Sequence, residues 1–256
     1  MQISDERFIL GIMIKIIDAH CHIQSTQDIA HMLSRADDMG VVGAICNATS
    51  PRDWDNVIKT CNKYDNIYGC VGVHPWHIAT VAGDDTWVAH MCELLHQNPN
   101  LMVGEIGLDK NYPDLDAQER IFIAQLNIAY EYNRPAFIHC VGAWNRILYI
   151  LKKQKSRLPK IMVAHAFSGP TDIIERLISQ YNFYFSYSPM ITDARHRRAI
   201  DAVHHTPDCR ILVESDAPDI SGAANVLHHI ANIKSVAVDK IADTIYKNII
   251  MVLNNG

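Results

Sequence analysis

Short runs of apolar and β-branched residues recur along the chain at fairly regular intervals. Eight such runs are present: IMIKIIDAH, VVGAICN, NIYGCVGVH, LMVGEIGLD, PAFIHC, KIMVAHAF, YNFYFSYS and RILVESDAP. They are nearly continuous in apolar residues rather than alternating with polar ones, which is typical of strands buried on both faces of a parallel sheet. The pattern therefore predicts eight buried parallel strands.

Segments with a helical pattern lie between most of these runs and after the last one. They cover residues 28–39, 54–64, 87–97, 116–133, 143–155, 171–180, 195–205 and 239–253. Strands that alternate with helices predict βαβ units with right-handed crossovers, and eight units in 256 residues match the size of a (β/α)₈ TIM barrel. We expect the last helix to close the outer ring of this α/β fold. A doubly wound open sheet is the alternative, although no GxGxxG turn or P-loop supports it.

The chain offers no Pro/Gly/Ser-rich linker or low-complexity segment at which a domain boundary could fall. We therefore expect a single domain over residues 1–256. The apolar segment FILGIMIKII near the start follows Asp5 and Glu6, where a secretory signal has basic residues, and Lys15 interrupts it well short of a membrane span. We expect it to form a buried first strand, and we expect no membrane partner.

Charge and cysteine content limit the classes of partner. With 23 Lys and Arg against 28 Asp and Glu, the net charge of −5 gives no overall positive field, so an anionic substrate must be held locally. The basic runs RHRR (195–198) and KKQKSR (152–157) are interpreted as solvated helix faces, with phosphate binding as the less favoured alternative. Seven cysteines without a CxxC pair indicate buried free thiols in a reducing compartment, so we expect a cytoplasmic protein.

Metal-ligating residue types fall where predicted strands end. In a barrel the carboxyl ends converge on one face, so side chains far apart in the sequence meet there. The period of two along a strand also puts His20 and His22 on one side. Four imidazoles and two carboxylates suit Zn²⁺, Mn²⁺ or Co²⁺, and six ligands are too many for one catalytic ion. We predict two divalent ions bridged by Glu105, with this ligand set: His20, His22, Glu105, His139, His165 and Asp216.

Other candidate residues carry weaker signals. Cys21 lies between the two histidines and should point to the opposite side of the strand, so we interpret it as packing. His74 in GVHPW follows the third strand on the same face, and we predict that it contacts substrate, with a role in structuring the loop as the alternative. The chain has no GxSxG elbow, which disfavours an α/β-hydrolase.

Six motifs together make the chain resemble the TatD family of metal-dependent hydrolases within the amidohydrolase-like superfamily. They occur in the family's order: DAHCHI (18–23), GVHP (72–75), GEIGLD (104–109), IHC (138–140), AHAFSG (164–169) and VESDAP (213–218). The resemblance implies that His20, His22, Glu105 and Asp216 serve one metal, and that Glu105, His139 and His165 serve the other. It further implies that Asp18, Glu214 and Ser168 support the ligands from behind. The family includes DNases that hydrolyse phosphodiester bonds with Mg²⁺, Mn²⁺ or Zn²⁺, often from a 3′ end.

The chain departs from the family pattern at two places. After IHC it has VGAW, where many members carry an Arg followed by an acidic residue, and after Asp219 it has ISGAANV in place of a longer basic or proline-containing segment. Because these positions neighbour the substrate rather than the metals, the resemblance supports the metal centre more strongly than the substrate.

The expected mechanism is hydrolysis by a water molecule that two divalent ions activate. Asp216 is the candidate to accept the proton of that water and pass it to the leaving oxygen, with Glu105 as the bridging carboxylate. DNA or a small phosphodiester is the expected substrate, and a monomer is the expected state. The alternatives are a metal-dependent amidase, lactonase or phosphotriesterase, or a non-catalytic metal-binding scaffold. Many such enzymes bridge their ions through a modified lysine, and this chain has Glu105 at that place.

Overall fold

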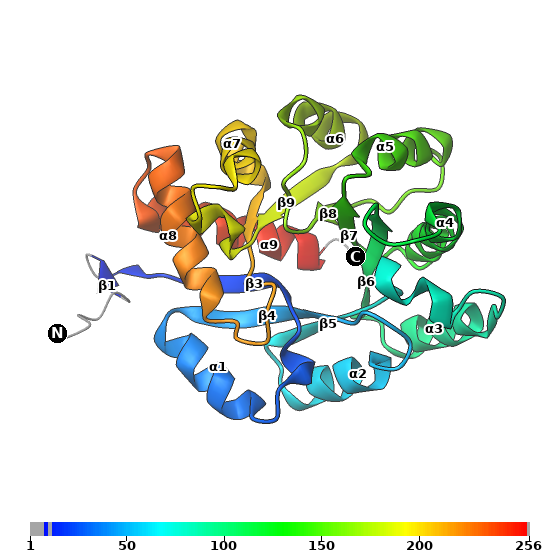
Figure 1. Cartoon of the computed structure of the whole chain (residues 1–256). Coiled ribbons are helices and arrows are strands. Elements are labelled where there is room, and N and C mark those ends of the chain that lie inside the picture. The colour runs from blue at the N-terminus through cyan, green and yellow to red at the C-terminus, as the bar shows by residue number, and fades with distance from the viewer. Residues whose placement is uncertain (1–7, 10–11, 255–256) are drawn as a thin grey trace.

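Eight parallel strands form the centre of the protein, which we describe from a computed structural model covering residues 8–9 and 12–254 (Figure 1). They are hydrogen-bonded in chain order: β3 (Ile16–Cys21), β4 (Val41–Asn47), β5 (Ile67–Val71), β6 (Met102–Asp109), β7 (Ala136–Val141), β8 (Met162–Ala164), β9 (Phe183–Tyr187) and β10 (Ile211–Val213). The segment after β10 closes the ring, because the Asp216 N–H donates to the His20 carbonyl at 3.0 Å and the His22 N–H donates to the Ala217 carbonyl at 3.2 Å. The predicted barrel is confirmed, and the open-sheet alternative is wrong.

Helices surround the barrel and connect the strands (Figure 1). They are α1 (Ile29–Asp38), α2 (Trp54–Lys63), α3 (Thr86–Gln97), α4 (Leu115–Glu131), α5 (Trp144–Lys153), α6 (Ile174–Tyr181), α7 (Arg197–His205), α8 (Gly222–Lys234) and α9 (Val238–Asn254). Short 3₁₀ segments add η1 (Ile23–Ser25), η2 (Pro75–Thr80), η3 (Thr171–Ile173), η4 (Pro189–Thr192) and η5 (Asp208–Arg210). All the predicted helical segments are confirmed, whereas α8 was not among them.

Local signals in the sequence explain where several helices begin and end. Asp28 caps α1 by accepting from the His31 N–H at 3.1 Å, and Asp114 caps α4 by accepting from the Ala117 N–H at 2.9 Å. Such a cap contributes about 1 kcal/mol. Asn182 ends α6 in the left-handed region at φ 53°, a conformation that Asn tolerates better than most residues.

The barrel interior is filled by a separate apolar cluster that reaches the last helix. Side chains from the strands, among them Ile17, Met102 and Phe137, pack there with Ile249 and Val252 of α9. Because the strand residues lie mostly toward the amino ends, α9 covers the amino-terminal opening of the barrel, and Figure 1 shows it behind the strands. It also packs on β10 and β3 at the seam of the barrel, so the last helix closes the outer ring as predicted. The carboxyl-terminal opening is left for the functional site.

The N-terminal apolar segment is not a single barrel strand. β1 (Phe8–Ile9) and β2 (Ile12–Met13) form an antiparallel pair of their own, and the first barrel strand begins only at Ile16. Lys15 is exposed between them, so a charged position separates the hairpin from the buried strand. The prediction of one buried first strand is wrong in this respect, and residues 10 and 11 of that segment lie outside the described residues.

Two further expectations concern the thiols and the membrane. All seven cysteines are free, but only Cys21, Cys46 and Cys70 are buried as predicted. The other thiols are partly buried, except that of Cys209, which is exposed because it lies in the surface segment η5. Among the described helices, none combines the length and the apolar content that crossing a membrane requires.

Candidate metal centre

The six predicted ligands meet at the carboxyl-terminal side of the barrel, but two of them are not at strand ends as predicted. Glu105 lies inside β6, which continues to Asp109, and His139 lies inside β7, which continues to Val141. The register between these strands shifts between Val103 and Ile106, and such an irregularity re-aims a side chain. At Gly107 (φ 154°) a Cβ would lie 1.9 Å from the His139 carbonyl, so only glycine allows this close approach.

Glu105 stands between two groups of imidazoles. Its Oε2 atom lies 3.2 Å from Nε2 of His20 and 3.8 Å from Nε2 of His22. Its Oε1 atom lies 2.8 Å from Nδ1 of His139 and 2.9 Å from Nε2 of His165. Each carboxylate oxygen therefore faces a different pair of histidines.

Asp216 completes the group that contains His20 and His22. Its Oδ1 atom lies 3.9 Å from Nε2 of His20 and 3.8 Å from Nε2 of His22. The residue adopts φ 52°, in the left-handed region where Asp is one of the more tolerant residues. Nδ1 of His22 is 3.0 Å from the Asn47 carbonyl, which makes Nδ1–H the donor and leaves Nε2 as an acceptor facing the two carboxylates.

His20 provides the clearest sign that these residues fit a metal ion. Its side chain is fully buried, and neither ring nitrogen has a hydrogen-bond partner among the described residues. A buried polar atom without a partner is costly and rare in proteins. Nitrogen and oxygen donors of this kind are ligands that zinc and similar divalent ions prefer. The donor set and this unsatisfied imidazole therefore fit a divalent ion bound by His20, His22, Glu105 and Asp216.

Carboxylates orient the imidazoles of the other group. Glu214 Oε1 lies 3.4 Å from Nδ1 of His165, and Asp109 Oδ2 lies 3.4 Å from Nε2 of His139. Glu214 is itself fixed by the Ala166 N–H at 2.7 Å and by the Ser186 hydroxyl. Partners of this kind set the ring orientation and the tautomer, so each histidine presents its other nitrogen to Glu105.

The charges of the site follow from burial and from these contacts. Burial alone would raise the pKa of Glu105, but His165, His20 and His74 together hold it well below its usual value. Burial opposes protonation of His165, yet Glu105 and Glu214 raise its pKa well above the usual value. Burial lowers the pKa of His22, and the neighbouring His20 lowers it further. The bridging position therefore holds an anionic carboxylate among imidazoles.

His74 lies inside the cluster rather than at its open edge. It is 2% exposed, and its Nε2 is 3.2 Å from Glu105 Oε1. Its Nδ1 accepts from the Trp76 N–H at 3.1 Å, which leaves Nε2–H to donate to the carboxylate. Burial lowers the pKa of His74 to about 4, so it is neutral at physiological pH. That His74 contacts substrate stays a prediction.

The residues expected to support the ligands occupy different positions. Buried Asp18 accepts from the His20 N–H at 3.1 Å and from the Ser215 N–H at 3.0 Å, which ties β3 to the segment after β10. Glu214 lies behind His165. Ser168 makes no hydrogen bond to a ligand side chain within the described part of the chain, and it lines a neighbouring cavity instead.

Sequence reasoning missed two supporting side chains, Asp109 and Ser186. Asp109 is the last residue of the GEIGLD motif, so the motif itself carried a usable signal. Ser186 lies in the otherwise aromatic strand β9, and nothing in its sequence context distinguishes it from a packing residue.

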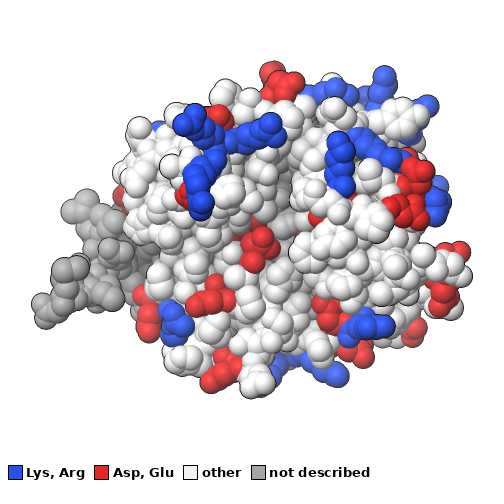
Figure 2. Space-filling model, viewed as in Figure 1, with Lys and Arg blue, Asp and Glu red and all other residues white. Residues whose placement is uncertain are grey.

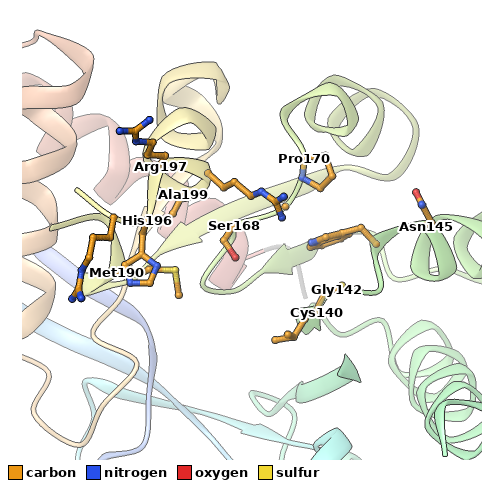
Figure 3. A pocket seen from close by; sticks show the side chains of 14 residues that line it. Cys140, Gly142, Asn145, Ser168, Pro170, Met190, His196, Arg197 and Ala199 are labelled. Carbon is orange, nitrogen blue, oxygen red and sulfur yellow. The ribbon is translucent and has the colours of Figure 1, made fainter. Parts of the chain in front are cut away.

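A cavity of about 810 Å³ opens beside the cluster. Its walls come from the end of β7 and from the segments that follow β7, β8 and β9. Figure 3 shows Asn145 and Pro170 on one side, His196 and Arg197 on the other, and Ser168 between them. The arginines of the RHRR run line this cavity and are exposed, which agrees with their interpretation as solvated side chains. They belong to the loop before α7 and to its first turn, which stand at the carboxyl-terminal side of the barrel.

Fold and site together define a (β/α)₈ barrel with a mixed histidine and carboxylate centre for divalent ions, which is the class of barrel metal-dependent hydrolases. The chain belongs to the family described as TatD related DNase, whose model matches residues 17–254. This confirms the family resemblance of the six motifs.

Individual relatives agree with this placement. The chain is 30% identical over 203 residues, 76% of its length and 75% of the relative's, to the 3'-5' ssDNA/RNA exonuclease TatD of Shigella flexneri serotype 5b. It is 27% identical over 259 residues, with coverage of 94% and 98%, to YjjV, an uncharacterized metal-dependent hydrolase of Escherichia coli K12. The crystal structure of YjjV superposes with a TM-score of 0.87 at 26% identity, covering 94% of this chain and 98% of YjjV.

Proposed function

We propose that the protein is a nuclease that hydrolyses phosphodiester bonds of single-stranded DNA or RNA with two divalent ions. The observation that carries the proposal is Glu105, whose two oxygens face separate histidine pairs. The substrate is supported by the relative from Shigella flexneri, which is a single-strand exonuclease. The free cysteines support a reducing, cytoplasmic location.

In this proposal each ion is held by one of the two groups. His20, His22 and Asp216 would hold one ion, His139 and His165 would hold the other, and Glu105 would serve both. When bound, such ions lower the pKa of water toward neutrality and neutralise the charge that develops on the phosphoryl oxygens, and we propose Zn²⁺, Mn²⁺ or Mg²⁺ in this role. That chemistry reconciles an anionic substrate with a chain whose net charge is −5.

The side chains of the protein have two further roles in this proposal, proton transfer and orientation of the imidazoles. The Asp216 side chain is 37% exposed, whereas that of Glu105 is 4% exposed. Asp216 is therefore the carboxylate that an attacking water can reach, and it accepts the proton and returns it to the leaving oxygen. Asp109 and Glu214 keep the imidazoles of His139 and His165 oriented throughout.

Glu105→Gln tests the proposal, because it keeps the shape of the side chain and removes its charge. We expect kcat/KM on a single-stranded oligonucleotide to fall at least about 100-fold, which corresponds to about 2.7 kcal/mol. Metal analysis of the same sample should show fewer than two ions per chain. Glu175 is an exposed residue in the first turn of α6, and Glu175→Gln is the matched control. It should keep the wild-type activity and the wild-type metal content.

A substrate panel separates this proposal from the other reactions that barrel centres of this kind support. It compares single-stranded DNA, bis-p-nitrophenyl phosphate, a lactone and a dipeptide. If the protein hydrolysed only the lactone or only the dipeptide, its activity would be that of a lactonase or an amidase, and the proposed nuclease activity would be wrong. Two bound ions without turnover of any of the four would indicate a scaffold.

A further inference from the structure

The cavity beside the metal centre is lined by basic side chains and by no acidic one. Arg195, His196, Arg197 and Arg198 line it together with neutral residues, in a chain whose acidic residues outnumber its basic ones. Figure 2 shows basic side chains gathered over α7 at the edge of a hollow that leads toward the middle of this face, where acidic side chains lie. We call this space the arginine cavity.

The position of the arginines is unfavourable for the fold itself. Arg197 and Arg198 are the first two residues of α7, whose first turn contains no acidic side chain. Positive charge is disfavoured there, because the N-terminal end of a helix carries a partial positive charge. Arg195 pairs with Asp193, but within the described part of the chain neither Arg197 nor Arg198 has an ion-pair partner. Asp201 lies one turn further along α7, but it forms no ion pair with either arginine in the described part of the chain.

The arginine cavity is continuous with the metal centre along the chain. Cys140 and Val141 in one wall follow His139 directly, and Ser168 in another wall comes three residues after His165. The cavity and the metal centre therefore open on the same, carboxyl-terminal side of the barrel (Figure 2). The cavity volume of about 810 Å³ lies within the range of small-molecule sites, so it is much larger than one phosphate group requires.

We propose that the arginine cavity binds the phosphodiester backbone of the nucleotides next to the cleaved bond, with Arg197 and Arg198 as the phosphate contacts. Guanidinium groups match phosphate oxygens in a planar, bidentate way. Contacts to the backbone position a strand without selecting its sequence. The inference rests on the proposed function and deepens it, because it assigns the residues that hold the strand beside the cleaved bond.

The test is the double variant Arg197→Gln/Arg198→Gln, with Arg176→Gln on the exposed side of α6 as the matched control. Binding of the metal-loaded protein to a phosphorothioate single-stranded oligonucleotide is measured by fluorescence anisotropy over a range of salt concentrations. The association constant falls as salt rises, and each cation lost should make the slope of log K against log salt less steep by about 0.7. The slope of the double variant should therefore be less steep than that of the wild type by about 1.4. The loss should be equal for oligo-dT and oligo-dA.

A kinetic ratio complements the binding measurement. Bis-p-nitrophenyl phosphate reports the metal centre alone, so kcat/KM on the oligonucleotide divided by kcat/KM on this small ester should fall in the double variant. An unchanged salt slope and an unchanged ratio would overturn the inference and leave the proposed function standing. Wild-type protein that hydrolyses neither substrate would overturn the proposed function, whatever the arginines do to binding.

Discussion

The ligand cluster and the arginine cavity differ in the elements that build them and in how firmly their side chains are held. In the cluster, His139 and His165 each have a carboxylate partner at both ring nitrogens, and Glu105 is fixed inside a strand. In the cavity, Arg197 and Arg198 are exposed at the first turn of a helix. The barrel strands thus fix the reacting groups, and the surrounding segments supply the substrate contacts.

The two regions also differ in how strongly a bound ligand should stabilise them. The cluster buries an anionic carboxylate and an unsatisfied imidazole, so it should gain much from a cation. The cavity keeps its charges in water, where electrostatic interactions are weak and screened by salt. Perturbations of the cluster should therefore have larger effects than perturbations of the cavity.

Removal of divalent ions should give the largest effect. A chelator should abolish phosphodiester hydrolysis and lower the Tm by about 10 °C, since an ion at 1,000 times its Kd stabilises the folded state by about 4 kcal/mol. Differential scanning fluorimetry with Zn²⁺, Mn²⁺ and Mg²⁺ added back measures both recovery and preference. The Glu105→Gln variant should respond less to the chelator. Equal Tm values with and without ions would contradict a metal centre in this cluster.

A smaller effect is expected behind the ligands, at Glu214→Gln. Glutamine can keep the contacts to Ser186 and Ala166, but it removes the negative charge that faces Nδ1 of His165. Loss of such a partner typically weakens metal binding 10- to 100-fold, so the apparent Kd should rise by about that factor. Competition with a chromogenic chelator measures it, with Glu175→Gln as the control. If Glu214→Gln binds ions as tightly as wild type, His165 is not oriented in this way.

The cluster could be predicted from the sequence because each ligand follows or ends an apolar run, and barrel topology brings such positions together. The sequence did not indicate how far each ligand is from its strand end. Glu105 lies well inside β6, beside a register shift and close to Gly107. An apolar run does not reveal these backbone features, so the sequence could not show this position. Asp109 and Ser186 were missed because their roles depend on contacts with other strands.

In the outer parts of the fold, too, some features could be predicted from the sequence and others could not. Strands and most helices follow from hydrophobic periodicity, but α8 begins with small residues, GAANV, which give a weak helical pattern. The position of α9 under the barrel depends on an opening that only the closed sheet creates. The RHRR run is charged like a solvated helix face, and only its place at the start of α7 puts it beside the site.

The smallest expected effect is a change in the Tm of the arginine double variant, and it should be a rise rather than a fall. Its sign shows whether the two arginines serve substrate binding or the stability of the fold. If Arg197 and Arg198 are unfavourable at the start of α7, Arg197→Gln/Arg198→Gln should raise the Tm, by about 2 °C, while oligonucleotide binding weakens. Thermal unfolding of the metal-loaded protein at low salt measures the shift, and high salt should reduce it because the helix dipole is screened. Arg176→Gln also lies in the first half of a helix but outside the cavity, so it should leave oligonucleotide binding unchanged. A lower Tm in the double variant would mean that the arginines stabilise the fold, and their unfavourable placement would then no longer support a role in substrate binding.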